Sequence, residues 1–234
     1  MYDPGDRRYL HPFINCTCCG PRLTILDALP YDRERTSMKA FPMCPACASE
    51  YRSPASRRYD AQPVCCNDCG PEAYLLDRPE RGRAAVTEAR RILASGGVIA
   101  VKGIGGFHLC CDATNPEAVR LLRERKRRSA KPFAVMAATL EVARRECQVS
   151  SEAETILDGH QKPILLLPRH AGGLVCEEVS PDNPKLGIML PYAPLQLLLF
   201  GEEAMQSPTE GASSRMPDVL VMTSANDSGA PICR

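Results

Sequence analysis

Four cysteines near the N-terminus have the spacing of a structural zinc site. Cys44 and Cys47 form one C-x-x-C pair, Cys66 and Cys69 form a second, and 18 residues separate the pairs. Four thiolates complete the tetrahedral shell that zinc adopts in structural sites, and paired knuckles at this separation are typical of them. The spacing therefore predicts one closed zinc site, with four isolated thiols as the alternative.

A third pair, Cys16 and Cys19, belongs to a repeat of fifty residues. Residues 3–21, DPGDRRYLHPFINCTCCGP, align without a gap with residues 53–71, SPASRRYDAQPVCCNDCGP. The repeat predicts another zinc module that contains Cys16 and Cys19 and whose second pair would precede Met1. We therefore expect the chain to begin inside the first of two tandem modules.

The repeat region also contains cysteines, a histidine and arginines outside the paired cysteine positions. The repeat duplicates neither Cys18 nor Cys65, which we interpret as spare thiols; the alternative is that Cys18 or His11 completes a makeshift metal site. Each copy also contains Arg-Arg-Tyr. We expect these arginines to bridge the knuckles rather than bind RNA, because Phe13 and Tyr2 are too few rings for base stacking.

Three segments of the second half could bind a phosphate-bearing ligand. The glycines in KGIGG let the backbone approach a ligand closely. The arginines and lysines in RKRRSAK suit phosphate oxygens. In MTSAN, the alternation of side chains along a strand directs two polar side chains to the same side of the strand end. Each pattern alone also has an ordinary alternative: a tight turn, a solvated helix face or a strand end. The candidate contact residues are Lys102, Gly105, Gly106, Lys126, Arg128, Lys131, Ser224 and Asn226.

The elements that must position these residues alternate along the chain from residue 84 onward. Strands separated by helices predict an α/β sheet with helices packed on it. Residues 1–75 lack long periodicity and 76–83 resemble a linker, so we expect a zinc region over 1–75 and an α/β domain over 84–234. The patterns predict helices at 84–97, 115–128, 139–147, 151–159 and 193–200, strands at 98–102, 132–137, 163–168, 185–190 and 218–224, and an exposed loop at 201–217.

Composition narrows the classes of function. The 234 residues carry a net charge of +1, which gives no overall attraction to nucleic acid or to a membrane surface. The sequence has no apolar run of membrane-spanning length and no secretion signal. Thirteen cysteines, eight of them within residues 16–69, therefore favour metal binding in a reducing cytoplasm over disulfides.

Long strings of the sequence resemble the nickel–iron hydrogenase maturation carbamoyltransferase family, HypF. They include PFINCTCCGPR, FPMCPACASEYRSPASRRYDAQPV, VKGIGGFHLCCDATNPEAVRLLRERKRRSAKPFAVM and LVMTSAN. The resemblance implies a YrdC-like twisted sheet with flanking helices, preceded by a small zinc-knuckle region of irregular structure. It also implies an internal piece of a longer protein, because family members carry acylphosphatase-like and transferase domains as well. The family usually has histidine at the positions of Asp60 and Gln196.

The resemblance also implies a reaction. In this family the YrdC-like module joins ATP and carbamate derived from carbamoyl phosphate into carbamoyl-adenylate, and the carbamoyl group passes to the C-terminal cysteine of the partner HypE. The family's Lys-x-Arg motif matches Lys126 and Arg128, which would act on the phosphates and carbamate. Zinc would be structural, and Mg²⁺ would accompany ATP.

The remaining roles follow from the same resemblance. Lys102 and Lys131 would be supporting cations, Ser224 and Asn226 would hold the nucleotide, and the Gly105–Gly106 turn would form the floor of the site. Cys110 and Cys111 are expected to be core thiols. Two alternatives remain: a threonylcarbamoyl-adenylate synthase in tRNA modification, and a non-catalytic zinc module that binds RNA.

Overall fold

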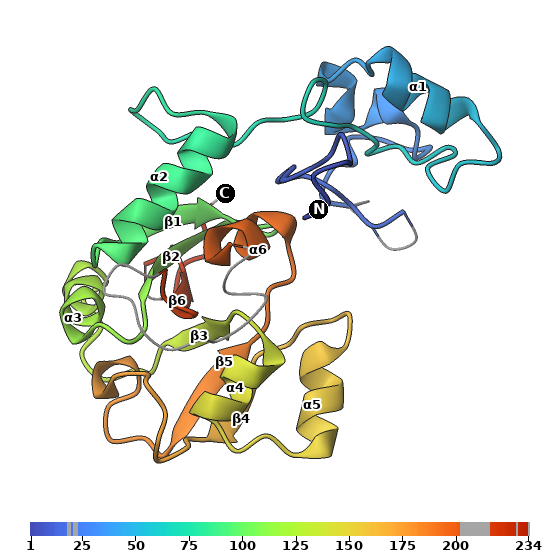
Figure 1. Ribbon diagram of the computed structural model, residues 1–234. Coiled ribbons are helices and arrows are strands. Elements are labelled where there is room, and N and C mark those ends of the chain that lie inside the picture. Colours follow the sequence, from blue (N-terminus) through green and yellow to red (C-terminus); the bar gives the residue numbers. More distant parts are fainter. Residues whose placement is uncertain (18–19, 21–22, 202–215, 228, 234) are drawn as a thin grey trace. The chain divides into compact units, whose positions relative to one another are not determined.

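The computed structural model describes residues 1–17, 20, 23–201, 216–227 and 229–233. The chain divides into two compact units, Met1–Val86 and Thr87–Arg234 (Figure 1). Each unit is described here by itself. Among the described residues, every helix is too short or too polar to cross a lipid bilayer.

The N-terminal unit is largely irregular, as the sequence predicts. Its helices are the short 3-10 turns η1 (Arg33–Arg35) and η2 (Ser37–Ala40) and the α-helix α1 (Pro45–Arg52). The sequence analysis missed α1, whose eight residues give little periodicity; a proline at its first position, directly after Cys44, fixes the backbone dihedral that starts it. Arg33 braces the loops, since its guanidinium donates to the carbonyl oxygens of Phe41, Gln62 and Val64 at 2.5–2.9 Å.

The fifty-residue repeat is also a repeat of the backbone. Leu10 and Asp60 occupy equivalent positions, and both adopt the left-handed conformation, with φ of 55° and 52°. The glycine that follows each knuckle is required by close approach, because a Cβ at Gly20 or Gly70 would lie 2.2 Å or 2.9 Å from the carbonyl oxygen of Cys16 or Cys66. Five backbone hydrogen bonds recur with the same offset, from the amides of residues 6, 9, 10, 11 and 14 and of residues 56, 59, 60, 61 and 64.

The C-terminal unit is built on a six-stranded sheet in the order β1-β2-β6-β3-β5-β4 (Figure 1). Only β3 and β5 pair in parallel; the other four pairs are antiparallel. The strands are β1 (Ile99–Lys102), β2 (Phe107–Asp112), β3 (Ala134–Ala137), β4 (Leu165–Pro168), β5 (Lys185–Met189) and β6 (Val219–Ser224).

Helices connect these strands and bury one side of the sheet. Side chains of α3, α4 and α5 pack with alternate residues of β2, β3, β5 and β6 in one continuous apolar core. Asn115, Thr139 and Ser150 cap the first turns of these helices through their side-chain oxygens, which accept from backbone amides. The helices are α2 (Gly82–Ala94), α3 (Pro116–Arg125), α4 (Leu140–Glu146), α5 (Ser151–Asp158) and α6 (Pro194–Phe200), with the 3-10 turn η3 (Glu177–Val179).

The predicted α/β class and the sheet with flanking helices are confirmed, with two local corrections. β2 was not predicted, because its FHLCCD sequence directly follows the glycine-rich turn and lacks polar–apolar alternation. The helix predicted over 115–128 ends at Arg125, since Lys126 caps it and Arg127 has a φ of 49°. Most of the expected loop at 201–217 lies outside the described residues.

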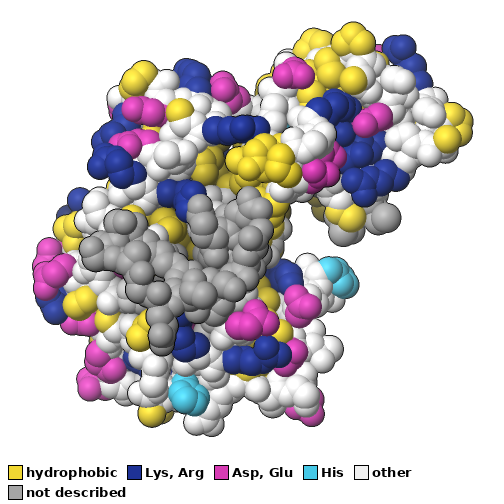
Figure 2. All heavy atoms as spheres, viewed as in Figure 1, with side chains coloured by type: hydrophobic (Ala, Val, Ile, Leu, Met, Phe, Trp, Pro, Cys, Tyr) yellow, Lys and Arg dark blue, Asp and Glu magenta, His cyan; other side chains and the backbone are white. Residues whose placement is uncertain are grey.

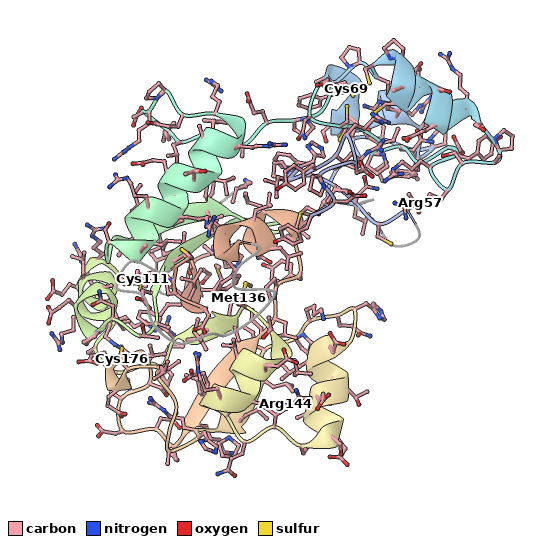
Figure 3. The ribbon with its side chains drawn as sticks, in the orientation of Figure 1. Arg57, Cys69, Cys111, Met136, Arg144 and Cys176 are labelled. Carbon is pink, nitrogen blue, oxygen red and sulfur yellow. The ribbon has the colours of Figure 1, made fainter. Side chains whose placement is uncertain are left out.

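Several expected core residues lie in this unit's interior. Cys110 and Cys111 are fully buried, as predicted for core thiols, and burial raises the pKa of Cys111 to about 12. Figure 3 labels Cys111 and Met136 within this unit. Phe133 is buried as well, and the guanidinium carbons of Arg123 and Arg128 lie 4.8 Å and 4.7 Å from its ring centroid. Phe133 therefore joins the apolar core to the basic turn that follows α3.

Truncation of this ring should be costly. We expect Phe133→Ala to lower the free energy of unfolding by ~3–5 kcal/mol, because it leaves a cavity and removes two cation–π contacts. Chemical denaturation of the purified protein measures the effect, with Ile164→Ala, which truncates an exposed side chain just before β4, as the comparison. A loss for Phe133→Ala no larger than for Ile164→Ala would contradict the packing described here.

Candidate functional site

Four thiols of the N-terminal unit converge on one point. The sulfur atoms of Cys44, Cys47, Cys66 and Cys69 all lie within 4.8 Å of one another. The sulfur–sulfur distances are 3.8 Å for Cys44–Cys66, 3.8 Å for Cys66–Cys69 and 3.6 Å for Cys47–Cys69. A tetrahedron with zinc–sulfur bonds of ~2.3 Å has edges of about 3.8 Å. The arrangement therefore fits a zinc ion and is too open for disulfides.

The surroundings shift the pKa values of two of these thiols in opposite directions. The backbone N–H of Cys47 lowers the pKa of the Cys44 thiol to about 7, whereas burial raises that of Cys47 to about 12. A bound divalent cation deprotonates its thiol ligands outright, which removes this penalty. The small cluster also forms an apolar core with Val64, so the site doubles as a packing centre.

Of the first cysteine pair, the structure describes Cys16, and Cys16 does not join this cluster. Cys16 is exposed, and Cys18 and Cys19 lie outside the described residues. His11, considered above as a makeshift ligand, is buried elsewhere: its Nε2 lies 3.3 Å from Cys65 Sγ and its Nδ1 lies 2.9 Å from Asn67 Oδ1. Cys65 is thus a spare thiol paired with a histidine, in line with its interpretation from the repeat.

The prediction that arginines bridge the knuckles is confirmed for the first Arg-Arg pair, Arg7 and Arg8, whereas Arg57 of the second pair is exposed. Arg7 donates to Cys47 Sγ at 3.0 Å and to Glu50 at 2.7 Å. Arg8 donates to Glu50 Oε2 at 2.5 Å and, through Nε, to the carbonyl oxygen of Cys65 at 2.7 Å. Figure 2 shows basic side chains gathered over the N-terminal unit on the face in view. These contacts join arginines of the first copy of the repeat to the segments that carry the four clustered cysteines.

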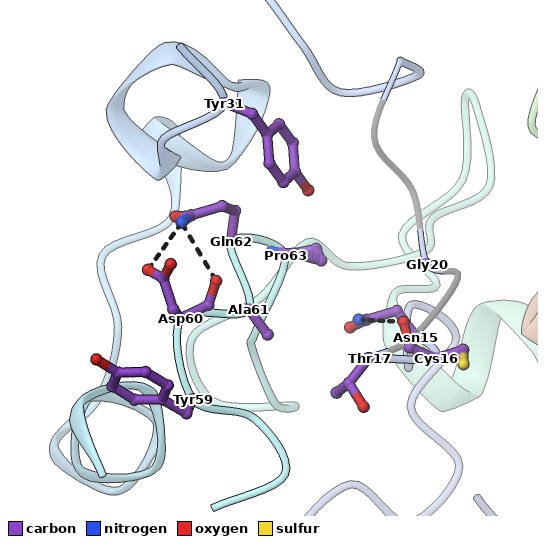
Figure 4. A pocket seen from close by; sticks show the side chains of 10 residues that line it. All are labelled: Asn15, Cys16, Thr17, Gly20, Tyr31, Tyr59, Asp60, Ala61, Gln62 and Pro63. Atoms are coloured by element: carbon purple, nitrogen blue, oxygen red, sulfur yellow. Dashed lines mark hydrogen bonds between the residues drawn. The ribbon is translucent and has the colours of Figure 1, made fainter. Parts of the chain in front are cut away.

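A hollow that is open to solvent lies beside Cys16. Figure 4 shows it between the segments around Cys16 and around Asp60. Asp60 accepts from Tyr51 Oη at 3.0 Å and from Gln62 Nε2 at 3.1 Å, so its carboxylate is held in place on the wall of the hollow. Gln196 is the second position, besides Asp60, at which the family usually has histidine. Its side chain caps α6, because its Oε1 accepts from the amides of Tyr192 and Ala193.

In the C-terminal unit, the basic turn after α3 meets the end of β6. The Lys126 ammonium donates to the carbonyl oxygens of Ser224 and Asn226 at 2.6 Å and 3.0 Å. Ser224 Oγ donates to Asn226 Oδ1 at 2.5 Å, so the two predicted polar side chains do turn toward one another. Burial lowers the pKa of Lys126, and Arg128 lowers it further. A partly desolvated cation of this kind is a good partner for an anion.

Arg128 adds a second cation from the same turn. It donates to Thr223 Oγ1 at 3.2 Å and to the carbonyl oxygen of Pro132 at 2.7 Å, while its buried Nε has no hydrogen-bond partner among the described residues. Thr223, one residue before Ser224, was missed by the sequence analysis. Strand alternation turns it to the opposite face of the sheet from Ser224, and nothing in the sequence indicated that Arg128 would reach that face.

The glycine-rich turn lies beside the same strand end. β2 pairs with β6 so that His108 lies opposite Ser224, and the amide of Ala225 donates to the carbonyl oxygen of Phe107 at 2.8 Å. Gly106 has a φ of 156°, and a Cβ there would lie 2.6 Å from the carbonyl oxygen of Cys233. Gly105 is exposed, with no atom within 4 Å of an added Cβ.

The two supporting lysines are not drawn into the Lys126 cluster. Lys102 is exposed, and its ammonium lies 4.6 Å above the ring centroid of Phe107. Lys131 is exposed as well, and its backbone carbonyl oxygen accepts from Arg123 Nη1 at 3.4 Å. Among the described residues, the predicted set therefore divides into a convergent group and an exposed rim: Lys126, Arg128, Ser224, Asn226 and Gly106 in the first, and Lys102, Gly105 and Lys131 in the second.

Comparison with protein families places this geometry in a known class. Residues 91–234 match the Sua5/YciO/YrdC family model, described as "Telomere recombination", and residues 1–26 and 43–76 match the HypF finger model. The crystal structure of Pyrococcus abyssi Sua5 in complex with L-threonine is 21% identical over 67% of this chain, with a TM-score of 0.53, and shares the fold. The C-terminal unit is thus a YrdC-like domain.

Closer relatives identify the family as a whole. Carbamoyltransferase HypF of Rhodobacter capsulatus is 49% identical over 96% of this chain, and that of Synechocystis is 43% identical over 100%. The structure of T. kodakarensis HypF and that of full-length HypF in the phosphate- and nucleotide-bound form are each 43% identical over 100% of this chain, with TM-scores of 0.89 and 0.84. The chain belongs to the HypF carbamoyltransferase family. It spans only 28–29% of the length of these relatives.

The two adjacent glycines of the turn give a matched test of the local geometry. Gly106→Ala should lower the free energy of unfolding by ~1–3 kcal/mol, because its φ is unfavourable and its Cβ would meet the backbone of Cys233. Gly105→Ala should change stability by less than ~1 kcal/mol, since its Cβ points into open space. Thermal unfolding of both variants measures the difference, and equal losses would show that the turn does not have this conformation.

Proposed function

We propose that the C-terminal unit forms carbamoyl-adenylate from ATP and carbamate derived from carbamoyl phosphate. The observation that carries the proposal is the convergence of the Lys126 ammonium with Ser224 and Asn226, which lie nearly a hundred residues away in sequence. A relative whose structure is described as phosphate- and nucleotide-bound supports a nucleotide as the ligand. Adenylyl transfer needs mainly positioning and neutralisation of phosphate charge, which fixed cations provide.

Each residue of the cluster has a proposed role. Lys126 and Arg128 contact the phosphates and the carbamate, and stabilise the charge that develops as pyrophosphate leaves. Ser224 and Asn226 hold the ribose or a phosphate, and Gly105 and Gly106 form the floor of the site. Lys102 and Lys131 supply supporting charge from the rim, and Mg²⁺ enters with the phosphates that provide most of its ligands.

We propose two domains, a zinc region over 1–75 and a YrdC-like nucleotide-binding domain over 84–234. In the first, Cys44, Cys47, Cys66 and Cys69 hold one structural zinc ion, which crosslinks two loops of an irregular fold. Cys16 and Cys19 supply half the ligands of a second site. None of the eleven described cysteines forms a disulfide, which supports a reducing, cytoplasmic compartment.

The whole-protein reaction extends beyond this chain. We propose that the carbamoyl group passes from the adenylate to the C-terminal cysteine of HypE during hydrogenase maturation. A mixed anhydride with AMP is a far better acyl donor than carbamate itself, which is why an adenylate suits such a transfer. ATP–pyrophosphate exchange tests the substrate: carbamoyl phosphate should support exchange, and exchange driven by threonine instead would overturn the proposal.

Binding of ATP should depend on the partly buried Lys126. Lys126→Ala should weaken Mg²⁺–ATP binding by at least about fivefold, ~1 kcal/mol, because it removes a charge-assisted contact to phosphate. Arg125→Ala is the matched control, since Arg125 is an exposed cation at the end of α3, one position away. Titration calorimetry measures both, and the assignment is wrong if the two variants bind ATP equally well.

The zinc content of the protein should depend on the cluster of Cys44, Cys47, Cys66 and Cys69. Cys47→Ser should remove one tightly held zinc ion per chain, because a neutral hydroxyl cannot replace a buried thiolate ligand. Cys233→Ser, which changes an exposed thiol of the other unit, should leave the zinc content unchanged. Elemental analysis after gel filtration measures it. If Cys16→Ser lowered the zinc content of this site as much as Cys47→Ser, the ligands would be wrongly assigned.

A further inference from the structure

We infer that Arg7 and Arg8 are outer-sphere residues of the Cys44–Cys47–Cys66–Cys69 metal site, supplied by the opposite copy of the repeat. The inference rests on the proposed zinc site and adds residues that lie 36 or more positions before its first ligand in the chain. Their role is to orient the ligand sulfur of Cys47 and to neutralise the charge of the bound complex.

The contacts are direct and directional. Arg7 Nη1 donates to Cys47 Sγ at 3.0 Å and lies 3.9 Å from Cys44 Sγ. Arg8 Nη2 lies 3.6 Å from the same Cys47 sulfur. N–H donors at these distances stabilise a thiolate, because a sulfur hydrogen bond is longer than one to oxygen and the donor is charged. Cys47 is fully buried, so protein groups must replace the water that would otherwise solvate its sulfur.

Protein contacts hold both guanidinium groups in place. Glu50, from the helix that begins after Cys44, accepts from Arg7 at 2.7 Å and from Arg8 at 2.5 Å. Arg8 is only 3% exposed, and its Nε donates to the carbonyl oxygen of Cys65, next to the ligand Cys66. The two arginines therefore tie together both knuckles of the site, one through α1 and one through the Cys65–Cys66 backbone.

The charges balance only when the arginines are counted. A divalent zinc ion with four thiolates is a dianionic complex, and burial of such a complex without counter-charges is expensive. Arg7 and Arg8 supply two positive charges beside it. Glu50 returns one negative charge, and Arg58, whose Nε lies 4.0 Å from Glu50, offsets it. Outer-sphere partners of this kind commonly change metal affinity by 10–100-fold.

The repeat provides an internal control for this role. Arg57 is the equivalent of Arg7 in the second copy, with the same Arg-Tyr after it and the same backbone turn. Arg57 is exposed, and among the described residues it donates to none of the four cluster sulfurs. In Figure 3 its side chain lies well away from Cys69. The two arginines thus differ in one respect that matters here, the contact with Cys47.

Cobalt substitution tests the inference in the full chain. The sulfur-to-cobalt charge-transfer band that is present in the unmodified protein and absent in Cys47→Ser defines the site. Arg7→Ala should raise the cobalt and zinc dissociation constants of this site by about tenfold and speed metal loss to a chelator. Arg7→Lys should recover part of the affinity, because it restores charge without the fork, and Arg57→Ala should leave the affinity unchanged.

The outcomes separate the two proposals. Equal metal affinity of Arg7→Ala and Arg57→Ala, with a cluster that still binds metal, would overturn the role of the arginines alone. Absence of a band that depends on Cys47 would overturn the zinc site and this inference together. Where Arg7→Ala lowers the affinity, circular dichroism of the C-terminal sheet and its thermal transition should stay unchanged, which excludes global unfolding as the cause.

Discussion

Convergence of four sulfur atoms within 4.8 Å is the constraint on which the N-terminal unit depends. The unit has few regular elements, and the core around the cluster is built from Cys47, Val64 and Cys66 with a few partly buried neighbours. A chain with so little apolar burial gains stability mainly from crosslinks, and a metal bound by four thiolates is such a crosslink. Two side chains near the cluster fix the geometry of the ligands. Arg33 donates to carbonyl oxygens of the loops, and Glu50 accepts from Arg7 and Arg8.

The C-terminal unit solves a different problem, since its stability comes from a sheet buried by helices. Here the polar cluster is placed by the ends of elements: α3 stops at Arg125, and β6 stops at Ser224. The Lys126 ammonium donates to the carbonyl oxygens of Ser224, the last paired residue of β6, and of Asn226, two residues further on. One lysine therefore both fixes the end of the strand and places a positive charge there. The same side chain would exchange backbone oxygens for phosphate oxygens when an anion binds.

The sequence predicted most elements, the four-cysteine cluster and the approach of Lys126 to Ser224 and Asn226, for reasons that differ in kind. Cysteine pairs and the Lys-x-Arg and Ser-x-Asn patterns are local, so their spacing is visible in the chain. By contrast, β2 was hidden by the glycines before it, and the Arg7–Cys47 and Arg128–Thr223 contacts join residues 40 and 95 positions apart. Such contacts follow from strand pairing and from the way the repeat folds on itself, which no single stretch of sequence encodes.

The crossing of arginines between the copies of the repeat has a consequence for how this region evolves and unfolds. In most tandem arrays each unit contacts its neighbour through an apolar surface, and units can be added or lost one at a time. Here one copy's charged residues complete the surroundings of the other's ligands, so the pair behaves as a single cooperative body. The backbone turns are the same in both copies, with left-handed Leu10 and Asp60 at matching places, whereas the side chains differ: the first copy supplies arginine donors and the second supplies ligand sulfurs.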